Sequence, residues 1–212
     1  MNNASKIEKS IWLSSTDTHV VEIIDQRSLP HRLIIEQLKT WQATEIAIRE
    51  MHVRGAPLIG VTAAYGMYFA TIEAVQNNKD KTFFDLVAQH LKASRPTAIN
   101  LAWAVDRQLQ LLHQISSPKE RIISSLNLAQ AISAEEVENC YKIGQHGLTL
   151  LEELAAISYV SNKAANHKKF SPTNAHQENN QDSKKTKVVL TKAGRLLSKF
   201  SIDPRLSKMI LT

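Results

Sequence analysis

The feature that most constrains the fold is the apolar segment from Leu58 to Val75, in which small residues recur among larger ones. A helix that is apolar around its whole circumference is buried in a core or spans a membrane. No stretch of this chain approaches the ~20 consecutive apolar residues that a membrane span needs. We therefore expect a buried helix, in which Gly60 and Gly66 let a neighbouring helix or backbone approach closely.

The residues before this helix are typical of a small sheet. Two short apolar runs, 11–13 and 20–24, flank the polar, turn-forming run 14–18, which predicts a β-hairpin. The run 32–36 follows Leu29-Pro30 and is predicted to form a third strand. Three short strands need helices packed on them to be stable.

The residues around and after the apolar segment have helical spacing. Ile46, Ile48, Met51 and Val53 predict a short helix before Gly55. Further apolar stripes predict helices over about 83–91, 101–112 and 118–154, the last with a break near Gly144 or Gly147. Residues 1–155 are thus predicted to form an α+β, predominantly helical domain, with a small antiparallel sheet followed by a helical bundle.

The composition changes in the last quarter of the chain. The formal net charge is +6, and the basic excess lies in residues 156–212. The stretch 161–187 is rich in Asn, Lys, Ser and Gln, cannot bury enough apolar surface to offset its ordering entropy, and is predicted to be disordered. We expect 156–212 to be a divergent, basic, solvated tail. The tail has few aromatic residues among its lysines and no recognisable nucleic-acid motif, so we expect no nucleic-acid partner.

The chain has one cysteine, Cys140, so neither an intrachain disulfide nor a cysteine-based zinc site can form. The first ten residues are polar and have no apolar run behind them, unlike a secretory signal. These features predict a cytoplasmic protein with no membrane partner.

Two motifs share one arrangement, an arginine just before a proline and a predicted helix start. They are Arg54-Gly55-Ala56-Pro57, and Arg95-Pro96-Thr97. Proline suits the first turn of a helix, and a helix start offers unpaired N–H groups and a partial positive charge to an anion. Gly55 lets a ligand approach the backbone. If the two starts converge, two guanidinium groups face one pocket suited to a phosphate.

The same spacing has a second interpretation. Both motifs could be ordinary helix caps, with each arginine paired to a surface carboxylate. Neither motif is a glycine-rich loop of the dinucleotide-binding or P-loop type.

Longer stretches around both motifs carry a family resemblance. Residues 47–61, which read Ala-Ile-Arg-Glu-Met-His-Val-Arg-Gly-Ala-Pro-Leu-Ile-Gly-Val, resemble the signature of methylthioribose-1-phosphate isomerases, and so do residues 94–107. Weaker matches are 24–30 and 143–147. The resemblance covers about residue 10 to about residue 155. The wider family includes ribose-1,5-bisphosphate isomerases and regulatory subunits of translation initiation factor 2B.

The resemblance implies that Arg54, Gly55, Ala56 and Arg95 bind the phosphate of a sugar phosphate. The family reaction converts S-methyl-5-thioribose 1-phosphate to S-methyl-5-thioribulose 1-phosphate in methionine salvage, an aldose–ketose isomerisation that needs no cofactor. The ring must open before hydrogen moves between C1 and C2, which requires a positioned acid–base pair. The eight histidines of this chain show no metal-ligand spacing, so no metal is expected.

The sequence also departs from the family pattern. The family's catalytic cysteine and aspartate lie beyond this region, the aspartate in a Rossmann-like second domain, and neither residue has a counterpart here. We therefore expect a truncated isomerase with no catalytic residue, which retains the phosphate half-site and is inactive alone. It could act with a separately encoded catalytic domain or as a homo-oligomer. The alternative is a non-enzymatic, sugar-phosphate-sensing or regulatory module.

The remaining chemically capable residues have structural interpretations. Cys140 is predicted to pack within a helix, and His52 and His146 to face solvent or cap helices. The three tryptophans are predicted to be core or rim residues. No partner can be identified from sequence for three carboxylates, Asp25, Asp85 and Asp106.

Overall fold

A computed structural model describes residues 9–153, 157–160 and 187–191. The chain divides into two compact units, Met1–Val137 and Glu138–Thr212. The prediction of a domain over 1–155 and a tail over 156–212 stays a prediction. The predicted disorder falls on residues 161–186, outside the described residues, and on Lys187, which begins a strand.

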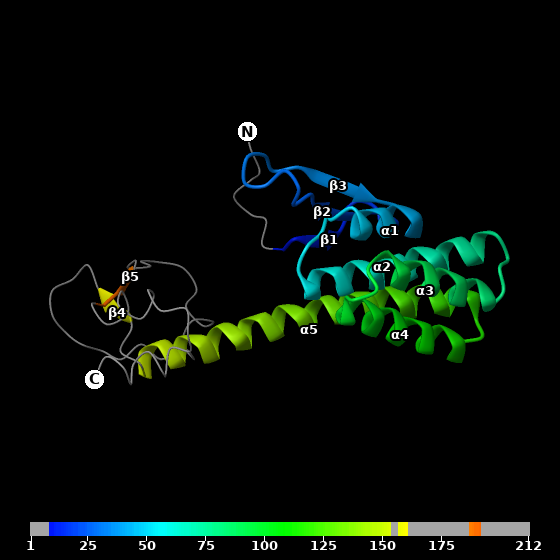
Figure 1. The fold of residues 1–212 in the computed structure, drawn as a ribbon. Coiled ribbons are helices and arrows are strands. Elements are labelled where there is room, and N and C mark those ends of the chain that lie inside the picture. Colours follow the sequence, from blue (N-terminus) through cyan, green and yellow to red (C-terminus); the bar gives the residue numbers. More distant parts are fainter. Residues whose placement is uncertain (1–8, 154–156, 161–186, 192–212) are drawn as a thin grey trace. The chain divides into compact units, whose positions relative to one another are not determined.

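The first unit opens with a three-stranded antiparallel sheet in the order β1-β2-β3 (Figure 1). The strands are β1 (Ile11–Leu13), β2 (Val21–Ile24) and β3 (Ile35–Leu38). Ile11 pairs with Ile23, and Val21 pairs with Leu38. These four side chains are buried, as the alternation of a half-buried sheet requires.

Four helices follow in the first unit: α1 (Trp41–Arg49), α2 (Ala56–Gln76), α3 (Thr82–Ser94) and α4 (Ile99–Gln114). A fifth helix, α5 (Pro118–Glu153), begins in the first unit and ends in the second. The side chain of Thr40 caps α1 by accepting a hydrogen bond from Ala43 N. The side chain of Asp80 accepts one from Thr82 N at the start of α3. The predicted α+β class, a small sheet followed by helices, is confirmed.

The second unit contains a short antiparallel pair, β4 (Ile157–Val160) and β5 (Lys187–Leu190). Ile157 pairs with Leu190, and Val160 pairs with Lys187.

The core lies around α2, which packs against α1, α3 and α4. Residues 59–72 of this helix are all buried, as the sequence predicted. By length and composition alone α2 could cross a membrane, which corrects the expectation that no stretch comes close. However, 78% of its most apolar window is buried inside the protein, as in the core helix of a soluble domain.

Gly60 makes the closest approach between α2 and α4 possible. A Cβ atom built on Gly60 would lie 2.8 Å from the backbone oxygen of Asn100, the second residue of α4. Because Gly60 is near the start of α2, the two helices begin at the same end of the bundle. Further along, Gln108 Nε2 donates a hydrogen bond to Ala64 O at 3.3 Å and to Ser125 O at 2.9 Å. Those bonds tie α2, α4 and α5 together.

Several element boundaries differ from the sequence-based predictions. The third strand covers Ile35–Leu38 rather than 32–36. Met51 and Val53 follow α1 rather than belonging to it, and Met51 has a φ of 60°, which ends the helical path. Residues 96 and 97 form a turn, so Pro96 does not stand in the first turn of α4.

The fifth helix also differs from expectation. It is continuous through Gly144 and Gly147, where a break was predicted. Nothing lies within 4 Å of a Cβ atom built on either glycine, and a solvent-exposed helical glycine costs only about 1 kcal/mol relative to alanine. Cys140 is exposed on this helix, so the prediction of a packing thiol was wrong.

The Gly60 contact predicts the effect of adding one methyl group. We expect Gly60→Ala to lower the free energy of unfolding by about 1–3 kcal/mol, because the new Cβ meets backbone that cannot move aside. Gly144→Ala is the matched control and should leave stability unchanged or raise it by up to ~1 kcal/mol. Unfolding followed by far-ultraviolet circular dichroism measures both. A Gly60→Ala protein as stable as the parent would contradict the assigned contact.

Candidate functional site

The first arginine motif forms the entry to α2. Gly55 is the N-cap and has a φ of 93°, a conformation in which any other residue would be strained. The first helical bond runs from Ile59 N to Gly55 O, at 3.0 Å. Within the described residues, the N–H groups of Gly55, Ala56 and Leu58 have no acceptor. Arg54, Gly55 and Ala56 are exposed, Leu58 is half-buried, and nothing lies within 4 Å of a Cβ atom built on Gly55.

The second arginine motif lies between α3 and α4. Arg95 is half-buried and is the C-cap of α3, and its carbonyl oxygen accepts a 3.0 Å hydrogen bond from Ala98 N. The turn at 96–97 carries the chain into α4, which begins at Ile99. Arg95 thus stands before the start of α4, as predicted, but separated from it by a turn.

The contact between Gly60 and Asn100 places both motifs at the same end of the α2–α4 pair. Arg54 and Arg95 each precede these contact residues by no more than about two helical turns of chain.

The two guanidinium groups differ from most others in the first unit. Those of Arg27, Arg49 and Arg107 each bind a carboxylate. No hydrogen bond or ion pair from the side chain of Arg54 or Arg95 is found among the described residues. The alternative interpretation requires a carboxylate paired with each arginine, and the part of the chain that the structure describes contains no such pair.

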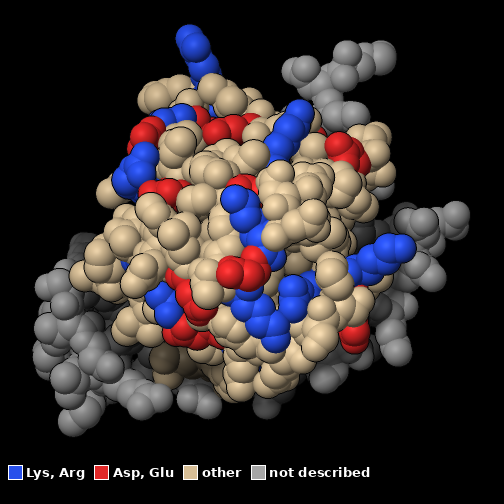
Figure 2. Space-filling view, turned by 90° about the vertical axis from the view of Figure 1, so that its right-hand side faces the viewer, with Lys and Arg blue, Asp and Glu red and all other residues tan. Residues whose placement is uncertain are grey.

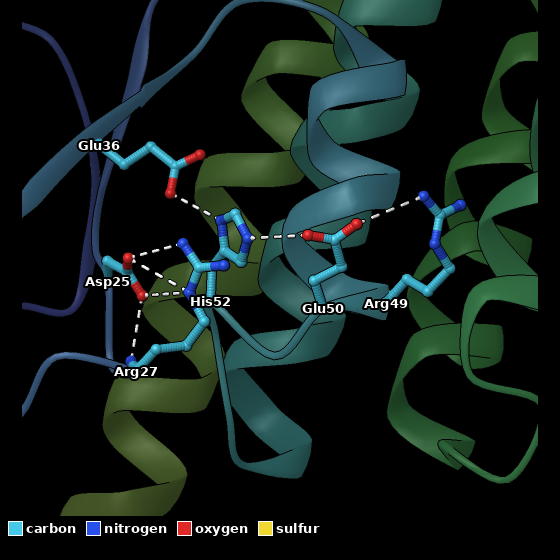
Figure 3. A network of polar contacts seen from close by, with 6 residues as sticks. All are labelled: Asp25, Arg27, Glu36, Arg49, Glu50 and His52. Atoms are coloured by element: carbon cyan, nitrogen blue, oxygen red, sulfur yellow. Dashed lines mark hydrogen bonds and ion pairs between the residues drawn. The ribbon is translucent and has the colours of Figure 1, made fainter.

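A polar network adjoins the first motif (Figure 3). It starts at the turn after β2, where Arg27 Nη2 donates to Asp25 Oδ2 at 2.8 Å and Arg27 Nε donates to Asp25 Oδ1 at 3.0 Å. Asp25 is buried, and the hydrogen bonds from the Arg27 side chain lower the pKa of its carboxyl below the usual value. Asp25 is therefore an ionised structural anchor rather than a free carboxylate.

His52 lies at the other side of the same network. Its side chain is only 8% exposed, which corrects the prediction that it faces solvent or caps a helix. Its Nδ1 lies 2.7 Å from Glu36 Oε2, and its Nε2 lies 3.7 Å from Glu50 Oε2 without a hydrogen bond. Because both ring nitrogens face carboxylates, His52 is held within the protein rather than presented to a ligand.

Sequence reasoning missed the role of Gln26. Its side-chain Oε1 accepts a 3.0 Å hydrogen bond from Arg54 N, and its backbone N–H donates a 2.8 Å hydrogen bond to His52 O. The only sequence signal was the weak family match that includes 24–26. Nothing in the spacing of the chain brings residue 26 to residue 54.

The other candidates have ordinary surroundings. Asp85 contacts His113 Nε2 at 3.0 Å, and Asp106 contacts the Lys92 ammonium. Trp103 is 40% exposed, and the guanidinium carbon of Arg107 lies over the Trp103 ring, 4.8 Å from the ring centroid. Among the described residues, no group of three or more His, Cys, Asp or Glu could hold a metal ion.

Charge on the surface is mixed rather than segregated on the face that Figure 2 shows. Lysine and arginine side chains lie beside aspartate and glutamate side chains, within a larger area of uncharged residues. Such a face lacks the continuous basic stripe that binds a nucleic-acid backbone.

Comparisons with known proteins find a matching family model and several similar proteins. The Initiation factor 2 subunit family matches residues 52–193. Methylthioribose-1-phosphate isomerase from Desulfosudis oleivorans is 43% identical over 147 residues, covering 69% of this chain and 40% of that protein. The isomerase of the same name from Cereibacter sphaeroides is 46% identical over 149 residues, covering 69% and 38%. The chain thus spans about 40% of the length of these curated relatives.

Two solved structures resemble part of the chain. The 5-methylthioribose 1-phosphate isomerase from Pyrococcus horikoshii has a TM-score of 0.54 and 29% identity, covering 61% of this chain and 37% of that one. Subunit delta of the translation initiation factor eIF-2B from A. fulgidus has a TM-score of 0.55 and 30% identity, with the same coverage. The same fold therefore occurs in an isomerase and in a translation factor subunit.

The Asp25–Arg27 pair makes stability depend on pH in a defined direction. Because the folded-state pKa of Asp25 is lowered, its contribution is present above the unfolded value of about 4 and is lost as pH falls through the folded value. We expect Asp25→Asn to lower the free energy of unfolding by about 1–3 kcal/mol at pH 7 and by less near pH 3. Chemical denaturation at both pH values measures this. A difference that grows at low pH would contradict the assignment.

Proposed function

Because the chain belongs to the Initiation factor 2 subunit family, we propose that it binds the phosphate group of a sugar phosphate where α2 and α4 begin. The relatives named above supply the substrate class, methylthioribose 1-phosphate. Arg54, Gly55, Ala56 and Arg95 are the proposed binding residues.

One observation carries this proposal. Arg54 and Arg95 precede two helix starts that adjoin at Gly60 and Asn100, and neither guanidinium has a protein partner among the described residues. Guanidinium groups make planar, two-pronged contacts with phosphate oxygens, and the free N–H groups at the start of α2 add donors. Unpaired positive charge beside unpaired N–H groups favours an anionic ligand.

We propose further that this chain binds without catalysing isomerisation by itself. The reaction requires an acid and a base within hydrogen-bond reach of the sugar carbons. Three groups are best suited to such chemistry. Asp25 is bound to Arg27, and His52 is bound to Glu36. Cys140 is exposed on α5, far along the chain from both motifs. In this proposal the described residues of the site would supply phosphate contacts, and other residues would supply the proton-transfer pair.

A second candidate function follows from the likeness to the translation factor subunit. A sugar-phosphate-sensing or regulatory module would use the same phosphate site without any turnover. The alternative is a cytoplasmic isomerase half that needs further catalytic residues, supplied by a separate polypeptide or in a homo-oligomer.

The phosphate site predicts a loss of binding when either arginine is removed. We expect Arg54→Ala and Arg95→Ala each to weaken binding of methylthioribose 1-phosphate by about 10–100-fold, the typical worth of a charge-assisted hydrogen-bonded contact. Isothermal titration calorimetry measures the dissociation constants.

Lys119→Ala is the matched control for the loss of one positive charge. Lys119 is exposed at the start of α5, beyond the far end of the 16-residue α4, so about 24 Å of helix separates it from the α4 start. This variant should bind as the parent does. Equal weakening in all three variants would show a general charge effect and refute the site.

The proposal also predicts the result of a turnover assay. We expect the purified chain to bind the sugar phosphate and to produce no methylthioribulose 1-phosphate, measured by phosphorus nuclear magnetic resonance over many hours. Turnover that Arg54→Ala abolishes would refute the inactive interpretation. Turnover that appears only when the remaining part of the Desulfosudis oleivorans relative is added would favour the isomerase half over the sensing module.

A further inference from the structure

Gln26 makes two hydrogen bonds to the loop that leads into α2. Its backbone N–H donates to His52 O at 2.8 Å, and its side-chain Oε1 accepts from Arg54 N at 3.0 Å. One residue therefore bridges two loop positions on either side of Val53. A pair of bonds fixes the direction of the backbone as well as its position, as paired bonds do in a sheet.

The turn that carries Gln26 is itself held by hydrogen bonds. Asp25 Oδ1 accepts from Arg27 N at 3.0 Å, in addition to its two-pronged contact with the Arg27 side chain. Asp25 N donates to Ile34 O at 2.9 Å, which joins the turn to the chain that enters β3. The residues on both sides of Gln26, Asp25 and Arg27, are therefore fixed by hydrogen bonds.

The loop is anchored from its other side as well. His52 N donates to Ala47 O at 2.9 Å, and His52 Nδ1 lies 2.7 Å from Glu36. Arg54 is the first residue after this anchored segment, and its N–H would be exposed without Gln26. The carboxamide is therefore the last fixed point before Gly55 and the free N–H groups of α2.

We propose that Gln26 is a positioning residue for the anion site: it binds the Arg54 backbone so that the Arg54 guanidinium and the Gly55 and Ala56 N–H groups point to one ligand. This inference rests on the proposed phosphate site. It assigns no contact between Gln26 and the ligand. Preorganised donors bind an anion more tightly because they lose less conformational freedom on binding.

The experiment separates the acceptor of Gln26 from its bulk. Gln26→Met keeps the length of the side chain and removes the acceptor, whereas Gln26→Glu keeps an acceptor at the same place. Gln37→Met is the matched control, because Gln37 also makes one side-chain hydrogen bond, to Glu22 Oε1 at 3.1 Å, but is an exposed residue of β3 and makes no bond to the Arg54 loop. The two readouts are the hydrogen exchange rate of the Arg54 amide and the affinity for methylthioribose 1-phosphate.

We expect Gln26→Met to speed exchange of the Arg54 amide and to weaken sugar-phosphate binding by about fivefold to tenfold, the typical worth of one neutral hydrogen bond. Gln26→Glu should preserve the slow exchange, and Gln37→Met should change neither quantity. Unchanged affinity in Gln26→Met, despite faster exchange, would overturn the positioning role alone. Absence of binding by the parent chain would overturn the phosphate site and this inference together.

Discussion

The structure depends on one close approach, that of α2 and α4 at Gly60. A side chain at this position would collide with the backbone of Asn100, so the contact requires a residue without a Cβ atom. Its location near the start of both helices has a consequence beyond packing. It sets two helix N-termini, each preceded by an arginine, at one end of the bundle, where their partial positive charges add. The same geometry that fills the core therefore builds the candidate anion site.

The elements that could be predicted from the sequence are those whose signal is local. The hairpin follows from a polar turn between apolar runs, and α2 to α4 follow from apolar spacing that needs no knowledge of partners. The third strand was displaced because its limits depend on pairing with β2, where Ile24 meets Ile35 and Val21 meets Leu38. The break expected in α5 did not occur, because a glycine on an exposed helical surface weakens a helix without ending it.

The candidate site divides in the same way. Arg54, Gly55 and Arg95 could be proposed from the sequence because proline and glycine mark the local backbone around them. The partners of the loop could not, because they come from distant positions: Gln26 lies on the turn after β2, and Glu36 lies on β3. His52 was assigned to the surface because sequence alone does not show that a carboxylate from another element covers it. Tertiary hydrogen bonds to a backbone leave no periodic trace in a sequence.

Binding and chemistry are physically separable in this fold. The proposed phosphate binding would need only donors fixed by helix starts and by the turn after β2, and all of these belong to the first unit. Proton transfer needs groups whose pKa and position suit the reaction at the sugar carbons, whereas Asp25 and His52, near the first motif, are bound to other side chains. The Asp25–Arg27 and His52–Glu36 contacts hold the backbone around the motif, and they leave these side chains less available for proton transfer. A chain built in this way would hold the proposed anion site in place while its acid and base came from other residues, an arrangement that either an enzyme half or a sensing module could use.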